Sequence, residues 1–187
     1  MRAETPLALR QHLVHGSNVS RQVAQNLVRW QSPRDGILRR FAASGHVSGS
    51  HHDAYSEALR DYGQNLGIAF QLVDDALDYS GRQALMGKSV GDDFREGKVT
   101  LPVILAVARA DEVALKFWKR AIETGPQSES DLDRAITLVE QTGAIADTMA
   151  RARGYAGLAA RALERVKPCE MREVLAAVAD FCVERAY

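Results

Sequence analysis

The chain has 187 residues, 46% of them apolar and 6% aromatic, and its 24 basic and 24 acidic residues cancel. That length suits one domain with a sizeable core, and no run approaches the roughly 20 uninterrupted apolar residues that a membrane-spanning helix needs. The two cysteines, Cys169 and Cys182, have no disulfide or metal-ligand spacing, so we expect reduced, packed thiols in a cytoplasmic protein without an integral membrane segment.

Residues 1–50 differ in composition from the rest of the chain. They contain seven arginines, no lysine and two acids, a balance of +5, whereas residues 51–187 have a balance of −5. Three explanations stay open for this Arg-, Ser- and His-rich segment, which we expect to be poorly organised: truncated or frame-shifted sequence that is not native, a targeting leader, or a basic tail. We expect no nucleic-acid binding, because few aromatic residues are interleaved with the arginines. The predicted boundary therefore separates residues 1–50 from a helical domain at 51–187.

The first helix is predicted from His52 to about Tyr79, because apolar residues recur there at three- and four-residue steps. Ser80-Gly81 should end it, and residues 81–97 read as a glycine-punctuated connection. A second helix is predicted from Lys98 to about Ala110, with Pro102 in its first turn. Its apolar face would consist of three residues: Leu101, Leu105 and Ala108.

Four further helices follow. A short one is predicted at Ala114–Ile122, and Ser130 is a plausible N-cap for the next, at Asp131–Gln141. Gly143 separates that helix from an alanine-rich one at Ala144–Val166, which should permit close helix packing. The last, about Glu170–Arg185, presents an apolar face of Val174, Leu175, Val178 and Phe181. No strand pattern occurs, so the predicted class is all-α.

A candidate site lies at the end of the first helix. Asp74 and Asp78 are four residues apart, so their carboxylates share one face, while Asp75 points roughly 100° away. Like charges at this spacing repel, which predicts a cation nearby. Mg²⁺ takes a few carboxylate oxygens and completes its coordination with water and substrate phosphates. Lys88 and Lys98, set among glycines, provide the positive charge that a phosphate requires.

These residues favour a metal–diphosphate half-site over the alternative, a solvated acidic surface. The acids lie among apolar neighbours and two Gly-Lys pairs follow them, which a plain surface helix would not need. Neither pair has the spacing of a P-loop, since five residues rather than four separate the glycines, so nucleotide binding is a poor interpretation.

The run Gly67-Ile-Ala-Phe-Gln-Leu-Val-Asp-Asp-Ala-Leu-Asp-Tyr79, followed by Gly87-Lys-Ser-Val-Gly-Asp-Asp-Phe-Arg-Glu-Gly-Lys-Val-Thr-Leu-Pro102, resembles the second aspartate-rich region of the all-trans polyprenyl diphosphate synthases, most closely the octaprenyl type. The likeness extends from about Tyr55 to the C-terminus. It implies the C-terminal half of an isoprenoid-synthase-type helical bundle.

The resemblance also implies roles for particular residues. Asp74 and Asp78 match the acids that hold Mg²⁺ on the allylic diphosphate, with Asp75 beside them. Lys88 and Lys98 match lysines that contact the diphosphate.

Phe70 and Gln71 match the pair that lines the reacting end of the substrate pocket. The implied reaction elongates an allylic diphosphate with isopentenyl diphosphate to a long-chain product for a quinone side chain. The implied assembly is a homo- or heterodimer.

One departure from the family pattern is evident. The family has a first aspartate-rich motif and an upstream Gly-Lys-Arg cluster, and residues 1–66 contain neither. We therefore expect weak or no activity of this chain alone. The alternative is a non-catalytic subunit or regulator that partners a full-length prenyl synthase.

Overall fold

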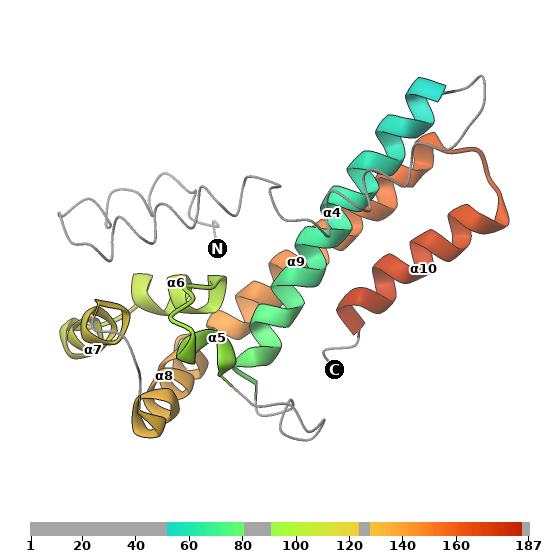
Figure 1. Ribbon diagram of the computed structural model, residues 1–187. Coiled ribbons are helices and arrows are strands. Elements are labelled where there is room, and N and C mark those ends of the chain that lie inside the picture. Colours follow the sequence, from blue (N-terminus) through green and yellow to red (C-terminus); the bar gives the residue numbers. More distant parts are fainter. Residues whose placement is uncertain (1–51, 81–90, 124–127, 185–187) are drawn as a thin grey trace. The chain divides into compact units, whose positions relative to one another are not determined.

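The computed structural model describes residues 52–80, 91–123 and 128–184, and all regular structure in these ranges is helical (Figure 1). The helices, in chain order, are α4 His52–Asp78, α5 Asp92–Arg95, α6 Leu101–Ala108, α7 Glu112–Glu123, α8 Glu129–Gln141, α9 Ala144–Ala162, the 3₁₀ turn η2 Leu163–Arg165, and α10 Glu170–Glu184. No strand occurs in these ranges, so the all-α prediction is confirmed. The segment 1–50 lies outside the described residues.

The described chain divides into two compact units. The first, here called the α6 unit, contains residues 75–146 and holds the end of α4, helices α5 to α8 and the start of α9. The second, the α10 unit, contains the earlier part of α4 together with residues 147–184. Each unit has its own core, and α4 and α9 contribute residues to both.

The core of the α10 unit is built on small side chains. Its buried cluster consists of Tyr62, Leu66 and Ala69 from α4, Ala156, Ala159 and Ala162 from α9, and Leu163, Ala179 and Cys182. The three alanines of α9 recur every three residues and let its backbone come close to α4, which confirms the expectation of close helix packing. The Tyr62 hydroxyl donates a 2.8 Å hydrogen bond to the Leu175 carbonyl, which ties α10 to α4.

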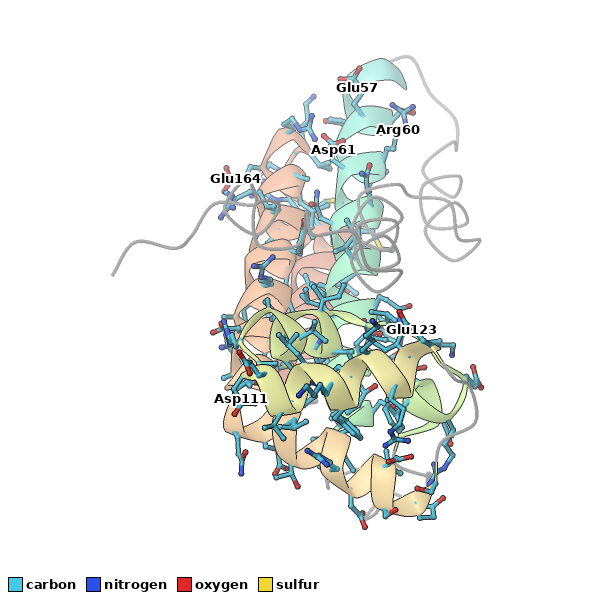
Figure 2. All side chains as sticks on the ribbon, turned by 90° about the vertical axis from the view of Figure 1, so that its left-hand side faces the viewer. Glu57, Arg60, Asp61, Asp111, Glu123 and Glu164 are labelled. Atoms are coloured by element: carbon cyan, nitrogen blue, oxygen red, sulfur yellow. The ribbon has the colours of Figure 1, made fainter. Side chains whose placement is uncertain are left out.

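One ion pair of the α10 unit joins Asp61 of α4 to Arg165 of the 3₁₀ turn. In Figure 2, Asp61 and its neighbours Glu57 and Arg60 lie at the same end of this unit as Glu164. Of these charged residues, Asp61 and Glu164 adjoin Tyr62 and Leu163 of the apolar cluster in the chain.

Helix α10 packs through a narrower face than its sequence suggests. Leu175 packs against the core, and Ala179 and Cys182 are buried in it. The other predicted apolar residues, Val174, Val178 and Phe181, are instead exposed.

The expectation of two packed cysteines is half right. Cys182 is buried and Cys169 is exposed, and neither forms a disulfide. Cys169 immediately precedes α10, in a connection rather than in a helix face, which is why its side chain is not packed.

The α6 unit has α6 at its centre. Every residue from Leu101 to Val107 is buried, and α6 packs against α7 and α8. The prediction of one apolar face ending in Ala108 is therefore wrong, since Ala108 is exposed while the rest of the helix is enclosed. The helix also begins at Leu101 rather than Lys98, because the N-cap Thr100 is extended (φ −87°, ψ 171°) and Pro102 occupies the first turn.

Aromatic rings join α5 to α7 in the same unit. The Trp118 ring, 1% exposed, meets Phe94 edge to face at 6.4 Å and Phe117 at 5.2 Å between centroids. Two guanidinium groups, of Arg120 and Arg134, lie 5.6 and 4.9 Å from the centre of the Phe117 ring.

Side-chain caps set the starts of α7 and α8. The Asp111 carboxylate accepts the Ala114 N–H at 2.8 Å, so α7 starts two residues earlier than predicted, and Figure 2 places Asp111 and Glu123 at its two ends. The predicted cap Ser130 is wrong. Ser128 caps α8, in a reciprocal capping box with Asp131.

None of the helices in the described ranges is both long and apolar enough to cross a lipid bilayer.

Candidate functional site

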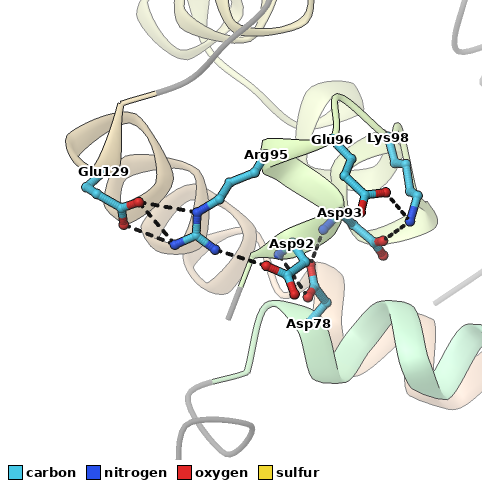
Figure 3. Close-up of polar contacts among 7 residues, drawn as sticks. All are labelled: Asp78, Asp92, Asp93, Arg95, Glu96, Lys98 and Glu129. Atoms are coloured by element: carbon cyan, nitrogen blue, oxygen red, sulfur yellow. Dashed lines mark hydrogen bonds and ion pairs between the residues drawn. The ribbon is translucent and has the colours of Figure 1, made fainter. Parts of the chain in front are cut away.

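The candidate site is the last turn of α4 and the short helix that follows it. Both oxygens of the Asp78 carboxylate accept backbone N–H groups of α5, from Asp92 at 3.2 Å and from Asp93 at 3.1 Å (Figure 3). The Asp78 carbonyl accepts the Gly91 N–H at 2.9 Å. The N-cap Gly91 has no side chain, so a carboxylate from another helix satisfies the amides that would otherwise have no partner.

Gly91 is required at this junction for two reasons. Its φ is +81°, a conformation that L side chains rarely adopt, and a Cβ there would lie 2.2 Å from the Leu132 Cδ1 atom. The backbone of the site therefore comes into close contact with α8.

A glycine also ends α5 and turns the chain back on itself. Gly97 has φ +69°, its N–H donates to the Phe94 carbonyl at 3.0 Å, and the Lys98 N–H donates to the Asp93 carbonyl at 2.8 Å. This pair of bonds is a Schellman motif. It places the Lys98 ammonium against carboxylates of the same short segment, 2.9 Å from Asp93 and 2.7 Å from Glu96.

The second cationic residue of the segment, Arg95, forms ion pairs with other carboxylates than Lys98 does. The Arg95 guanidinium forms an ion pair with Glu129 at 3.1 Å and with Asp92 at 3.3 Å, as Figure 3 shows. Arg95 thus ties α5 to the start of α8.

Negative charge predominates around Asp78. Burial raises the pKa of the Asp78 carboxyl, and the negative charge of Asp93 raises that pKa further, although hydrogen bonds from the backbone of Asp93 and Asp92 oppose the shift. The pKa of Lys98 is also raised, by its bonds to Asp93 and Glu96. The site is therefore one that an additional cation would stabilise.

The predicted acids and lysines are placed as follows. Asp74 is half-buried one turn before Asp78 on α4, Asp75 is 1% exposed and Asp78 is 7% exposed. Lys98 is exposed and lies in the same segment as the residues that bind Asp78. Lys88 lies outside the described residues.

The two predicted pocket residues lie on the surface of α4. Phe70 is 40% exposed and Gln71 is also exposed. Both lie about one helical turn before Asp74.

Three residues of the site did not appear in the sequence-based prediction: Asp92, Asp93 and Glu96. The available signal was Gly97, because a glycine at the end of a helix places the following residue against the one five positions before it. That spacing joins Lys98 to Asp93.

The residues present fit a magnesium site in which the protein supplies only one or two carboxylates. Within the described ranges, no three His, Cys, Asp or Glu side chains gather into a metal cage. Mg²⁺ does not require one, since it is commonly held by one or two carboxylates together with water and phosphate oxygens. An acidic helix end of two aspartates provides that donor set, and the pKa of Asp78 is raised there by burial and, to a smaller extent, by the negative charge of Asp93.

The described residues, with their aspartates at the end of α4 and the glycine-lysine turn after α5, have the isoprenoid-synthase class of helical fold seen in similar solved structures. A model of the family described as polyprenyl synthetase matches residues 37–139, more than half of the chain, and the chain is a member of that family. The resemblance stated from the sequence is confirmed.

Two curated relatives illustrate the match. An octaprenyl diphosphate synthase of Haemophilus influenzae is 38% identical over 135 residues, covering 72% of this chain and 41% of the relative. A short chain isoprenyl diphosphate synthase of Methanothermobacter thermautotrophicus is 37% identical, covering 81% of this chain and 46% of the relative. The chain thus spans less than half the length of these relatives.

Solved structures agree. A polyprenyl synthase of Roseobacter denitrificans has a TM-score of 0.76 at 39% identity, covering 95% of this chain and 59% of that one. A polyprenyl synthase of Caulobacter crescentus, complexed with calcium and isoprenyl diphosphate, has a TM-score of 0.71 at 38% identity, covering 97% and 59%. The predicted fold class is confirmed.

Proposed function

We propose that the chain serves isoprenoid biosynthesis as a trans-polyprenyl diphosphate synthase. This prenyltransferase would elongate an allylic diphosphate with isopentenyl diphosphate to a long-chain product, for a quinone side chain. The observation that carries the proposal is the end of α4, where Asp78 caps α5 and the Schellman turn at the other end of α5 holds Lys98 against Asp93. Family membership supports the same conclusion.

In this proposal Asp74 and Asp78 hold Mg²⁺, with Asp75 buried beside them. Mg²⁺, when bound, supplies charge neutralisation for a diphosphate leaving group. Asp78 can bind a cation while it caps α5, because an ionised carboxylate has about four acceptor positions and the two amides of α5 use only two. Asp74, half-buried on the preceding turn of the same helix, adds the second carboxylate.

The lysines and two exposed residues of α4 contact the substrate. Lys88 and Lys98 donate hydrogen bonds to diphosphate oxygens, which favours departure of pyrophosphate because the donors are aimed at charge that grows in the transition state. Phe70 and Gln71 line the reacting end of the pocket. No side-chain nucleophile takes part.

The proposed partners come from this chemistry together with the family resemblance. The substrates are an allylic diphosphate and isopentenyl diphosphate, the cofactor is Mg²⁺, and the assembly is a homo- or heterodimer in the cytoplasm without nucleic acid.

The direct test incubates the 187-residue chain with farnesyl diphosphate, labelled isopentenyl diphosphate and Mg²⁺. A second incubation adds a purified full-length octaprenyl synthase. That synthase carries an inactivating change in its own second aspartate-rich motif. Because the chain has no first aspartate-rich motif, we expect labelled long-chain product only in the mixture, and its loss with Lys98→Ala. Absence of product from both incubations would reject the assignment.

A second candidate, a non-catalytic subunit that partners a full-length synthase, is favoured by the outer face of α10. Met171, Val174, Val178 and Phe181 are 64%, 50%, 43% and 66% exposed and recur at three- and four-residue steps, an apolar stripe of the kind that marks protein interfaces. If this reading is right, the chain changes the product length of an active synthase without carrying activity itself, and Phe181→Ser together with Met171→Ser abolishes that change. An unaltered product length in the wild-type mixture would reject it.

A further inference from the structure

Two carboxylates that differ in burial hold the Lys98 ammonium. The Asp93 side chain is 19% exposed, whereas that of Glu96 is 61% exposed, and Lys98 itself is 54% exposed. A lysine ammonium has three N–H donors, so two carboxylates leave one donor for a further anion.

Asp93 is fixed from three directions. Its backbone N–H donates to Asp78 at 3.1 Å, its carbonyl accepts the Lys98 N–H at 2.8 Å, and its carboxylate accepts the Lys98 ammonium at 2.9 Å (Figure 3). Asp93 therefore links the proposed metal ligand, Asp78, to the proposed diphosphate donor, Lys98. Two of the three links are made by the backbone and survive a change of side chain.

Glu96 is held differently. It is the residue after α5, its side chain is largely exposed, and its carboxylate meets the Lys98 ammonium at 2.7 Å. A long, exposed glutamate has several rotatable bonds and gains little from such a pair, so a stronger anion can displace it at small cost.

We propose that Asp93 is a positioning residue that aims the Lys98 ammonium at the diphosphate, and that Glu96 occupies the place on this ammonium that a diphosphate oxygen takes on binding. The inference rests on the proposed function and assigns roles to two residues of the same site. Asp93 keeps one donor of Lys98 engaged throughout, which holds the side chain in the binding geometry before the ligand arrives. Such preorganisation lowers the entropy cost of binding.

The proposal makes the two carboxylates act in opposite directions on affinity. Removing any negative charge near a diphosphate should tighten its binding if Coulomb attraction alone decides. We expect Glu96→Gln to bind diphosphate about two- to threefold more tightly than the wild type. We expect Asp93→Asn to bind it about three- to fivefold more weakly, a change in the range of one exposed ion pair.

The experiment is isothermal titration of the full 187-residue chain with pyrophosphate in excess Mg²⁺, for the wild type, Glu96→Gln, Asp93→Asn and Asp93→Glu. Asp93→Glu keeps the charge but moves the carboxylate by one methylene, so we expect weaker binding at unchanged net charge. Asp92→Asn is the matched control, because the Asp92 carboxylate pairs with Arg95 rather than with Lys98. Melting without ligand shows whether each variant folds.

The outcomes are distinguishable. Asp93→Asn and Asp93→Glu both binding as tightly as the wild type, or more tightly, would overturn the role of Asp93 and leave the proposed function intact. Glu96→Gln binding more weakly would overturn the role of Glu96. No pyrophosphate binding by the folded wild type would overturn the proposed function, and this inference with it. Should Asp93→Asn not fold, the charge-conserving Asp93→Glu decides.

Discussion

Different kinds of contact stabilise each of the two units of this chain. The α6 unit adds charged and polar bonds at its helix ends to the apolar core around α6: Asp78 caps α5, Arg95 binds Glu129 and a capping box starts α8. The α10 unit depends on alanines and one buried tyrosine. The residues proposed for chemistry lie towards the C-terminal end of α4 and in the segment that follows it, whereas α9 and α10 form a close-packed scaffold with the earlier turns of α4.

This contrast predicts that each unit responds to a different kind of substitution. Geometry at glycines and carboxylates should matter most in the α6 unit, and side-chain volume should matter most in the α10 unit. Four predictions test the contrast, in decreasing order of expected effect.

Gly91→Ala should cause the largest loss of stability, about 2–4 kcal/mol, because it combines a positive φ with a Cβ at 2.2 Å from buried Leu132. Gly97→Ala is the matched control. It has a similar φ of +69° but nothing within 4 Å of the added Cβ, so we expect about 1 kcal/mol. Urea unfolding of both variants measures the difference. Equal losses would show that contact with α8 does not constrain the site.

Ala159→Leu should destabilise the α10 unit by about 1–3 kcal/mol, because Ala159 is 0% exposed in the cluster where α9 meets α4 and has no room for added methylenes. Ala150→Leu, an exposed position on the same helix, should be nearly neutral. Hydrogen exchange of α9 and α10 amides reports on this unit. Similar exchange in both variants would argue against volume as its main constraint.

Tyr62→Phe should cost about 1 kcal/mol at neutral pH through loss of the hydrogen bond to Leu175. Burial raises the pKa of Tyr62 from 10.0 to about 12, with a smaller contribution from Cys182. Protonated Tyr62 therefore contributes stability that is fully present below pH 10 and is lost as the pH rises towards 12. The gap between wild type and Tyr62→Phe should therefore narrow over that interval. A constant gap in alkaline urea titrations would contradict this assignment.

Asp131→Asn should have the smallest effect, seen mainly in its dependence on pH. The Arg120 guanidinium, 2.5 Å away, lowers the pKa of Asp131 from 3.8 to about 2. The stabilisation is present above pH 3.8 and is lost as the pH falls towards 2, so the variant and the wild type should converge in acid. Urea unfolding of both proteins between pH 2 and pH 7 measures this convergence, and a constant difference over that range would contradict the assignment.

Helix content could be predicted from the sequence because it depends on local periodicity. The apolar repeat of α4 gave its limits to within one residue, and Gly143 marked the start of α9. The short helix α5 was missed, since four residues cannot show a period and its N-terminus is capped by Asp78, fourteen positions before Asp92.

Caps and buried faces were less predictable for a related reason. Ser128 and Ser130 are equally good caps by residue type, and only the reciprocal bonds to Asp131 decide between them. The sequence placed Asp78 and Lys98 in one site through the family resemblance. It did not predict that Asp93 joins them, because that contact needs both the Schellman turn and the end of α4.

The central claim is that the aspartates at the end of α4 bind a diphosphate through Mg²⁺, and thermal unfolding with and without Mg²⁺ and pyrophosphate tests it most directly. We predict that the pair of ligands raises the Tm of the wild type and of Asp133→Ala, because ligands that bind only the folded state stabilise it by mass action, and that Asp74→Ala abolishes the rise. An equal rise in Asp74→Ala, or none in the wild type, would contradict the claim.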